Sequence, residues 1–287
     1  MKKGWLVVNA FLRTEKFEKV YDLLVQSAQK RGMELCVRYA TDLLLPVGEA
    51  WQDLPDFVLF WDKDISLARR LAQFVPVFNS PKAIALCDNK ILTAEALEKA
   101  NVPTPKTVIA PKTFEGVGYS EELLVKAEAF LGYPFVIKEA FGSFGKQVYL
   151  AKDRLSAFEI LRKIGYKDCI LQEFISESAG QDIRVNVVGD KVVCAMRRYN
   201  DNDFRSNISG GGKAERIALT KQQEQTALTA CKALNLDFAG VDILCAEIPL
   251  VCEVNSNPSF KSTLDYTGVD LSAYIMEYID ERLADLR

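Results

Sequence analysis

The stretch "GVDILCAEIPLVCEVNSNPS", residues 240–259, decides how the rest of the chain is interpreted. It reads as two apolar strands joined by a short turn at "AEIP", yet it contains Asp242, Glu253 and Asn255. Because side chains alternate between the two faces of a strand, we expect Glu253 and Asn255 on one face and Cys252 on the other. In a hairpin, Asp242 can lie across from that pair. The pattern predicts three oxygen donors on one face of a sheet.

Such a cluster suits a hard cation. Buried carboxylates are costly unless they are paired or bound to a metal. A donor set made of oxygens favours Mg²⁺ or Mn²⁺ over zinc. The alternative from the residues alone is a partly exposed sheet face that carries surface acids.

Composition excludes several classes of function. The 287 residues are 49% apolar and 26% charged, the balance of a globular protein large enough for more than one lobe. A net charge of -3 gives no reason to expect nucleic acid or an anionic membrane as partner. No apolar run approaches the roughly 20 residues of a membrane helix, and the charges that follow "MKKGWLVVNAF" argue against a signal peptide. We therefore expect a cytoplasmic protein.

The chain has no histidine, and its seven cysteines are scattered without C-x-x-C spacing. These facts exclude histidine bases, Ser-His triads and imidazole metal ligands, and they disfavour zinc sites and disulfide frameworks. Any chemistry must use carboxylates, lysines, arginines and backbone amides.

The first third of the chain alternates strands and helices, which predicts a lobe with a parallel sheet. Strands are expected at "GWLVVNA", "ELCVRYA", "DFVLFWD", "PFVIKEA", "KQVYLAKD", "CILQEFI", "DIRVNVVGD" and "KVVCAMRRY". Helices are expected over 15–30, 65–74, 89–100, 155–164, 221–234 and 271–286. We divide the chain into an N-terminal lobe (1–88), a linker helix with a central lobe (89–175) and a C-terminal lobe (176–287).

Three further motifs carry weak signals on their own. "IKEAFGSFGKQV" puts Lys138 at a strand end and "GSFGK", residues 142–146, in a turn whose backbone N–H groups could wrap a phosphate. Its spacing matches neither named phosphate motif, so a hairpin with incidental lysines is the favoured interpretation of that segment alone. "LQEFI" offers a strand exit where a planar base could stack, but a core strand that ends in a surface acid is the favoured interpretation of that segment alone. "FRSN" places Arg205 in a polar loop, where a solvated arginine is common.

Taken in order, "CDNK", "PFVIKEAFGSFGK", "QEFISESAGQDIRV", "DFRSN…GGK" and "GVDIL…PLVCEVNSNP" resemble the ATP-grasp superfamily. The chain is most similar to the group that includes the bacterial enzyme adding glutamates to the tail of a small-subunit ribosomal protein. The similarity extends over residues 79–266. It implies an ATP-grasp fold of class α/β, with α+β central and C-terminal lobes and ATP between these two lobes.

The resemblance also implies a role for each matching residue. Those implied to bind ATP are Lys90, Lys138, Gly142, Ser143, Gly145, Lys146, Gln172, Glu173, Phe174, Ile175, Asp182, Arg184, Arg205, Ser206 and Asn207. Among them, Lys90 and Lys138 are implied to hold phosphates, and Glu173 and Phe174 are implied to form the hinge around adenine. Arg205 and Asn207, with Lys213, are expected to be catalytic, and Asp242, Glu253 and Asn255 are expected to hold Mg²⁺ or Mn²⁺.

The implied reaction is ATP-dependent ligation of a carboxylate to an amine through an acyl phosphate. Glutamate or another amino acid would be joined to a peptide, a protein tail or a small molecule, and such relatives often form homo-oligomers. We expect Asp242→Asn or Glu253→Gln to abolish ligation and leave the fold largely intact. One departure concerns Gly210, which stands where the family often has a second arginine.

Two other classes stay open at this point. A non-catalytic regulatory module could keep the ATP site without turnover, and Gly210 leaves room for that alternative. A dinucleotide-dependent oxidoreductase is suggested by the N-terminal pattern, but no G-x-G-x-x-G follows the first strand.

Overall fold

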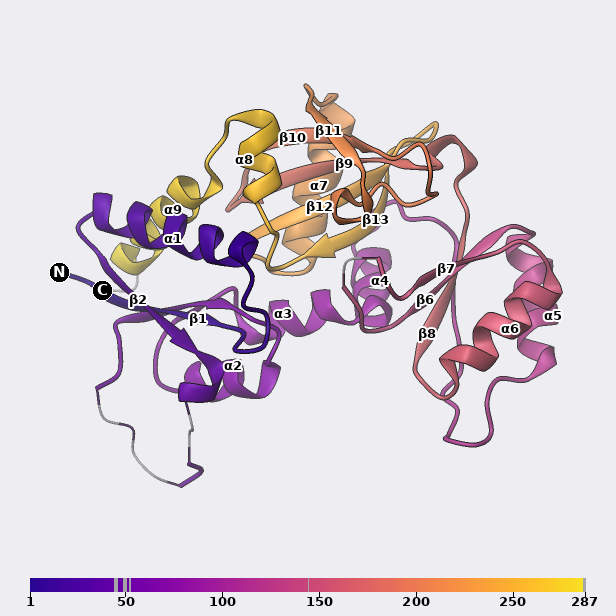
Figure 1. Ribbon diagram of the computed structural model, residues 1–287, viewed down its shortest axis with the longest axis horizontal. Coiled ribbons are helices and arrows are strands. Elements are labelled where there is room, and N and C mark those ends of the chain that lie inside the picture. Colours follow the sequence, from indigo (N-terminus) through magenta and orange to yellow (C-terminus); the bar gives the residue numbers. More distant parts are fainter. Residues whose placement is uncertain (44–45, 49–50, 52, 144, 286–287) are drawn as a thin grey trace.

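The structure is a computed structural model that describes residues 1–43, 46–48, 51, 53–143 and 145–285. Three β-sheets organise these residues into three lobes. In Figure 1 the N-terminal lobe is indigo and purple, the central lobe is magenta at the opposite end, and the orange and yellow C-terminal lobe lies between them. The expected order of a parallel-sheet lobe, a central lobe and a C-terminal lobe is confirmed, and the sheets of the last two lobes are antiparallel.

The N-terminal lobe is a parallel sheet in the order β2-β1-β3-β4, covered by helices on both faces. Its elements are β1 (Lys3–Val8), α1 (Glu15–Lys30), β2 (Glu34–Tyr39), the 3-10 turn η1 (Ala40–Asp42), β3 (Phe57–Trp61), α2 (Ile65–Leu71) and β4 (Val77–Phe78). All five residues of β3 are buried, which explains its unbroken apolar sequence "FVLFW".

Two consecutive helices lead to the central lobe, whose sheet has the order β5-β8-β6-β7. The elements are α3 (Pro81–Asp88), α4 (Lys90–Lys99), β5 (Thr107–Ile109), α5 (Glu121–Leu131), β6 (Phe135–Glu139), β7 (Val148–Ala151), α6 (Arg154–Ile164) and β8 (Cys169–Glu173). Helices α5 and α6 share a core with β6 and β8, built on side chains such as Phe135 and Leu171.

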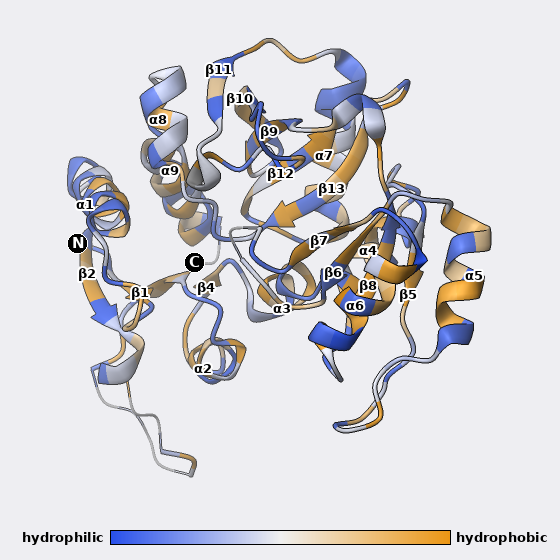
Figure 2. Cartoon of the chain, turned by 45° about the vertical axis from the view of Figure 1, so that its right-hand side comes forward, coloured by the Kyte–Doolittle hydropathy of each residue, from blue (hydrophilic) through white to orange (hydrophobic). Residues whose placement is uncertain are grey.

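The C-terminal lobe is an antiparallel sheet in the order β11-β10-β9-β12-β13. Its elements are η2 (Ser176–Ser178), β9 (Gln181–Val188), β10 (Lys191–Tyr199), η3 (Ile208–Gly210), β11 (Lys213–Arg216), α7 (Lys221–Ala233), β12 (Phe238–Leu244), β13 (Leu250–Asn255), α8 (Lys261–Thr267) and α9 (Leu271–Asp285). Helix α7 packs on one face of this sheet. In Figure 2 the edge strand β13 is largely orange, and its buried residues Val251 and Val254 belong to the core beneath α7.

The last helix returns to the first lobe. Apolar side chains of α9, including Ile275 and Met276, share one core with Leu6 and Leu24 of the N-terminal lobe. The hydroxyl groups of Ser27 and Ser272 lie 2.7 Å apart within this contact. Helix α9 follows the C-terminal sheet in sequence but packs against the N-terminal sheet. The domain limits given from the sequence stay a prediction.

Asn79 joins the N-terminal and C-terminal lobes. Its fully buried side chain donates to the carbonyls of Phe238 (2.9 Å) and Ser256 (2.8 Å) and accepts from the backbone N–H of Asp237 at 2.6 Å. This amide satisfies backbone groups at the edge of the five-stranded sheet that would otherwise be unpaired.

Several elements were not expected from the sequence. Helices α3, α5 and α8 and the short strands β4, β5 and β11 were not predicted from the sequence. Ser80 begins α3 by accepting from the N–H of Ala83 at 3.2 Å. Among the described residues, no helix is long and apolar enough to cross a membrane. Phe144 in the expected phosphate loop and Leu286 at the expected end of the last helix lie outside the described residues.

Candidate active site

Two adjoining cavities hold most of the predicted site residues. The first, which we call the central cavity, lies between the central and C-terminal lobes and measures about 100 Å³. It is lined by the predicted residues Lys90, Lys138, Gly145, Gln172, Glu173, Phe174, Ile175, Asp182, Arg205, Ser206, Asn207, Asp242 and Glu253. The second, the N-terminal cavity, measures about 230 Å³ and is lined by Ser143, Arg184 and Asn255, together with Asn207 and Glu253 from the first set. Gly142, Lys146 and Lys213 line neither of these two cavities.

Lys138 is a buried cation on β6 that points into the central cavity. Its ammonium donates to Gln172 Oε1 at 2.6 Å, and Gln172 Nε2 in turn donates to Thr107 Oγ1 at 2.9 Å. Gln172 thus orients the lysine. No carboxylate pairs with Lys138 among the described residues, so its charge is available to an anion.

Cys252 corrects one expectation from the opening stretch. Its Sγ lies 3.3 Å from Lys138 Nζ, and it lines the central cavity together with Glu253. The predicted alternation would have turned it to the opposite face. The register of β12 and β13 shifts after Asp242, so β13 has an extra residue there, and this bulge points consecutive side chains toward one cavity.

Lys90 is the first residue of α4 and enters the same cavity. Burial lowers its pKa, Glu253 opposes that effect, and Lys138 adds to it. Two lysines from different elements, α4 and β6, and a carboxylate therefore act on one another within one cavity. A polyanion that binds there would relieve the repulsion between the two cations.

The predicted hinge around a base lies where β8 leaves the central sheet. Glu173 Oε2 accepts from the backbone N–H of Lys106 at 3.2 Å, and the ring of Phe174 packs edge-on against Phe204 at 6.3 Å. Phe174 and Phe204 both line the cavity, so an apolar wall stands beside the lysines. This wall suits a planar ring, whereas the lysines suit phosphates.

Two loops meet across the mouth of the central cavity. Arg205 Nη1 donates to the carbonyl of Gly145 at 2.6 Å, and Asp203 accepts from the same guanidinium at 2.7 Å. Gly145 has φ +70°, and a side chain there would place Cβ 2.8 Å from Asn207 Oδ1. A glycine is therefore required for this close approach. Across the N-terminal cavity, Lys63 Nζ donates to Ser143 Oγ at 3.1 Å and pairs with Asp88 at 2.5 Å.

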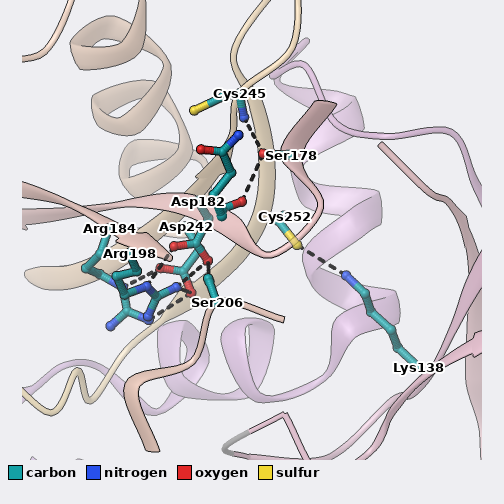
Figure 3. A network of polar contacts seen from close by, with 10 residues as sticks. Lys138, Ser178, Asp182, Arg184, Arg198, Ser206, Asp242, Cys245 and Cys252 are labelled. Atoms are coloured by element: carbon teal, nitrogen blue, oxygen red, sulfur yellow. Dashed lines mark hydrogen bonds and ion pairs between the residues drawn. The ribbon is translucent and has the colours of Figure 1, made fainter. Parts of the chain in front are cut away.

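A buried network of two acids and two arginines lines the two cavities, and Figure 3 shows these side chains pointing toward one another. Asp182 lies opposite Arg198 in the pairing of β9 with β10, and Asp242 lies opposite Arg184 in the pairing of β12 with β9. Directly paired residues share a face, so the register brings the four side chains together. Arg198 Nη2 is 2.5 Å from Asp182 and 3.0 Å from Asp242. Ser206 Oγ also donates to Asp182, at 2.5 Å.

The charges in this network stabilise one another. Burial alone would lower the pKa of Arg198, but Asp242 and Asp182 more than offset it and the pKa is raised. Burial would raise the pKa of Asp242, but Arg184 and Arg198 hold it below its usual value. Both groups therefore stay ionised in the folded protein.

The predicted metal ligands differ in their availability. Asp242 and Glu253 are paired across β12 and β13, as expected of a common face. Asp242 is bound on both oxygens by Arg184, with Nη2 to Oδ2 at 2.8 Å. Glu253 makes no hydrogen bond or ion pair among the described residues, and Asn255 Nδ2 is buried without a partner. An oxygen-seeking cation such as Mg²⁺ fits Glu253 and Asn255, while Asp242 serves the arginines in this conformation.

Neither Arg198 nor the contribution of the N-terminal lobe to the site was predicted from the sequence. Alternation along "KVVCAMRRY" places Arg198 on the same face as buried Met196, which was a usable signal for an inward-pointing arginine. Lys16, Lys63 and Asp62 line the N-terminal cavity from elements far away in sequence. No local pattern distinguishes them from surface residues.

A two-sheet clamp around a lysine-lined cavity, preceded by a parallel-sheet lobe, is an ATP-grasp fold. The model of the RimK-like ATP-grasp domain matches residues 87–279, and the chain belongs to this family. A protein named probable alpha-L-glutamate ligase from Mannheimia succiniciproducens is 34% identical over 224 residues, which cover 77% of this chain and 72% of the relative.

Solved structures agree in fold. The RimK domain protein of Sphaerobacter thermophilus superimposes with a TM-score of 0.75 at 22% identity, covering 96% of this chain and 98% of that one. The ATP-grasp ligase PsnB, in complex with a minimal precursor, Mg and ADP, gives a TM-score of 0.71 at 17% identity, with 98% of both chains covered.

Proposed function

We propose that this protein is an ATP-dependent carboxylate–amine ligase that attaches glutamate or another amino acid to a peptide, protein or small-molecule acceptor. The observation that carries the proposal is the convergence of Lys90 and Lys138 with Glu253 in one cavity that adjoins a second, amino-acid-sized cavity. The similarity to proteins named probable alpha-L-glutamate ligase supports glutamate as a substrate. The precursor peptide bound in another PsnB complex supports a peptide acceptor.

The chemistry follows from the poor leaving group of a carboxylate. A substrate carboxylate oxygen attacks the γ-phosphorus of ATP, the bond from that phosphorus to the bridging oxygen breaks, and ADP leaves. The resulting acyl phosphate is attacked by an amine, which forms the amide and expels inorganic phosphate while the amine loses a proton. The task of the protein is to position the reactants and neutralise charge.

The residues of the central cavity divide this task. Lys90 and Lys138 face the phosphates, and Gln172 keeps Lys138 in place. Glu253 and Asn255 would hold Mg²⁺, which offsets the charge that develops on the phosphates when it is bound. The hinge at Glu173 and Phe174 would take the adenine ring, between the apolar wall and the edge of β8.

The loops that carry Gly145 and Arg205 would exclude water from the acyl phosphate. Their hydrogen bond already closes one side of the cavity. Gly210, at the end of the turn η3, supplies no cation, and Lys213 is exposed on β11 outside both cavities. Stabilisation of the reacting group therefore falls to Arg205 and Asn207, which line the central cavity.

A mass-spectrometric screen tests the proposal. Purified protein with MgATP and pooled amino acids, alone and with acidic peptides, is expected to release ADP and to form a product whose mass corresponds to loss of one water between acid and amine. The Glu253→Gln variant is the negative control. ATP binding without ADP release under every acid and amine combination would instead indicate a regulatory module.

A further inference from the structure

The N-terminal cavity contains a positive charge that has no counterion in the part of the chain that the structure describes. Lys16, on α1, lines this cavity and makes no hydrogen bond or ion pair there. The three other cations among the described residues of the wall have acid partners. Lys63 pairs with Asp88 and Arg198 pairs with Asp182, each at 2.5 Å, and Arg184 pairs with Asp242. Lys16 is therefore the cation of this wall that is open to a ligand.

Arg184 faces the same cavity from β9 and adds a second positive charge. Burial lowers the pKa of Lys16, and the charge of Arg184 lowers it further, so the two cations influence each other across the cavity. Arg184 uses Nε and Nη2 to bind Asp242, which leaves its Nη1 without a hydrogen bond among the described residues. An anion placed between Lys16 and Arg184 would remove the repulsion.

Lys19 lies one turn further along α1 and, unlike Lys16, has an acid partner among the described residues. Lys19 pairs with Glu15, and neither residue lines the cavity. The unneutralised cation thus occurs on the face of α1 that borders the cavity.

The remaining lining fits a small polar molecule with a hydrocarbon stem. Three buried polar atoms of the lining lack a hydrogen-bond partner, namely Asn255 Nδ2, Asn257 Oδ1 and Ser259 Oγ. The aromatic side chains of Phe17 and Trp61 provide an apolar surface beside them. Buried polar groups of native proteins are usually satisfied, so a ligand or water is expected against these atoms.

We propose that Lys16 and Arg184 bind a carboxylate of the substrate that does not react, and that Lys16 thereby selects an acidic substrate. This inference rests on the proposed ligase function. Arg198, Asn207 and Glu253 line both cavities, so the reacting group lies at that shared border. No described residue of α1 lines the central cavity, so the group bound by Lys16 is away from the phosphates.

Equilibrium binding to the protein saturated with MgADP tests this specificity. The probes are L-glutamate against L-glutamine, and a peptide ending in two glutamates against one ending in two glutamines, each measured by calorimetry. We expect the wild type to bind one acidic probe about tenfold more tightly than its neutral match. Preference for free glutamate identifies an amino acid as the ligand, and preference for the peptide pair alone identifies a peptide end.

The variant Lys16→Met removes the charge and keeps the hydrocarbon stem, and Lys19→Met is the matched control on the same helix. We expect Lys16→Met to abolish the preference and Lys19→Met to retain it, with the affinity for MgADP unchanged in both. In turnover, Lys16→Met should raise KM for the acidic substrate about tenfold and leave kcat within about twofold.

A wild type that binds neither acidic probe more tightly than its neutral match would overturn the inference. A Lys16→Met variant that keeps the preference would overturn it as well. Calorimetry requires no turnover, so a failure of the ligase proposal would show as absent ADP release while the preference for the acidic probe remained measurable.

Discussion

Asp242 and Glu253 lie opposite each other on neighbouring strands but have different surroundings. Glu253 has no partner among the described residues and borders both cavities, whereas Asp242 is bound by Arg184 and Arg198. The sequence predicted equal roles for the two acids. At the scale of single residues, the structure separates a carboxylate that is free for ligand chemistry from one that also holds the sheet together.

Glu253→Gln should therefore eliminate activity without affecting the fold. Loss of one carboxylate that offsets phosphate charge is expected to lower ADP release by about two orders of magnitude or more. The melting temperature should stay within about 2 °C of the wild type, because no hydrogen bond or ion pair of the described residues is lost. Activity assays and thermal denaturation of the same preparation measure both; near-normal ADP release would remove Glu253 from the site.

Asp242→Asn should destabilise the protein, contrary to the expectation from sequence. The change leaves two buried guanidinium groups with one acid between them, which costs about 3–5 kcal/mol when a buried pair is broken. Urea denaturation of the variant and of Glu253→Gln measures the difference. Equal stability of the two variants would show that the arginines do not depend on Asp242.

Asp237 provides a pH-dependent prediction. Burial raises its pKa to about 6, although the hydroxyl of Tyr278 and the charge of Arg282 oppose the shift. The folded protein thus holds this proton more tightly than the unfolded chain, so stability decreases as the pH rises from about 4 to 6 and is level above that range. At pH 7 the ionised, buried Asp237 lowers the free energy of unfolding by about 3 kcal/mol, and Asp237→Asn should restore that amount.

Thermal unfolding of wild type and Asp237→Asn from pH 4 to pH 8 measures this effect. The gain in melting temperature should be largest above pH 6 and should disappear near pH 4. A difference that does not vary with pH would contradict the assignment.

At the scale of elements, periodicity predicts long helices and buried strands well. The helix predicted over 15–30 is α1 with the same limits, and "FVLFW" is β3. Short elements carry too few residues for a period to be recognised, which explains why β5 and α3 were missed. Only Asn89 separates the end of α3 from the start of α4, and the sequence predicted a helix from residue 89 onward but none over 81–88.

The bulge in β13 shows a second limit at this scale. Strict alternation assumes an uninterrupted register, and the shift after Asp242 depends on the partner strand rather than on the sequence of β13 alone. Glu253 and Asn255 were predicted to share a face and both line the N-terminal cavity, but Cys252 points toward Lys138.

At the scale of the whole molecule, the site depends on how three lobes are held together. Lys138 comes from the central lobe, Glu253 from the C-terminal lobe and Lys16 from the N-terminal lobe. The resemblance to a family predicted the first two residues, since they lie within its motifs. Lys16 could not be predicted, because its position depends on the packing of α1 and α9 against the first sheet.

Asn79→Ala tests the junction between the N-terminal and C-terminal lobes. The change removes hydrogen bonds to four buried or half-buried backbone groups and should cost about 2–4 kcal/mol. Asn202→Ala, at an exposed loop position, is the control and should be nearly neutral. Denaturant titrations compare the two, and equal stabilities would show that the junction does not depend on this amide.

The central claim is that a substrate carboxylate is activated by phosphoryl transfer in the cavity between Lys90, Lys138 and Glu253. The most direct measurement uses substrate labelled with ¹⁸O in its carboxylate and follows the label by mass spectrometry of the released phosphate. We expect one ¹⁸O atom in each phosphate, because the carboxylate oxygen that attacks phosphorus departs with it. Amide formation with unlabelled phosphate, or ADP release without amide, would contradict the account.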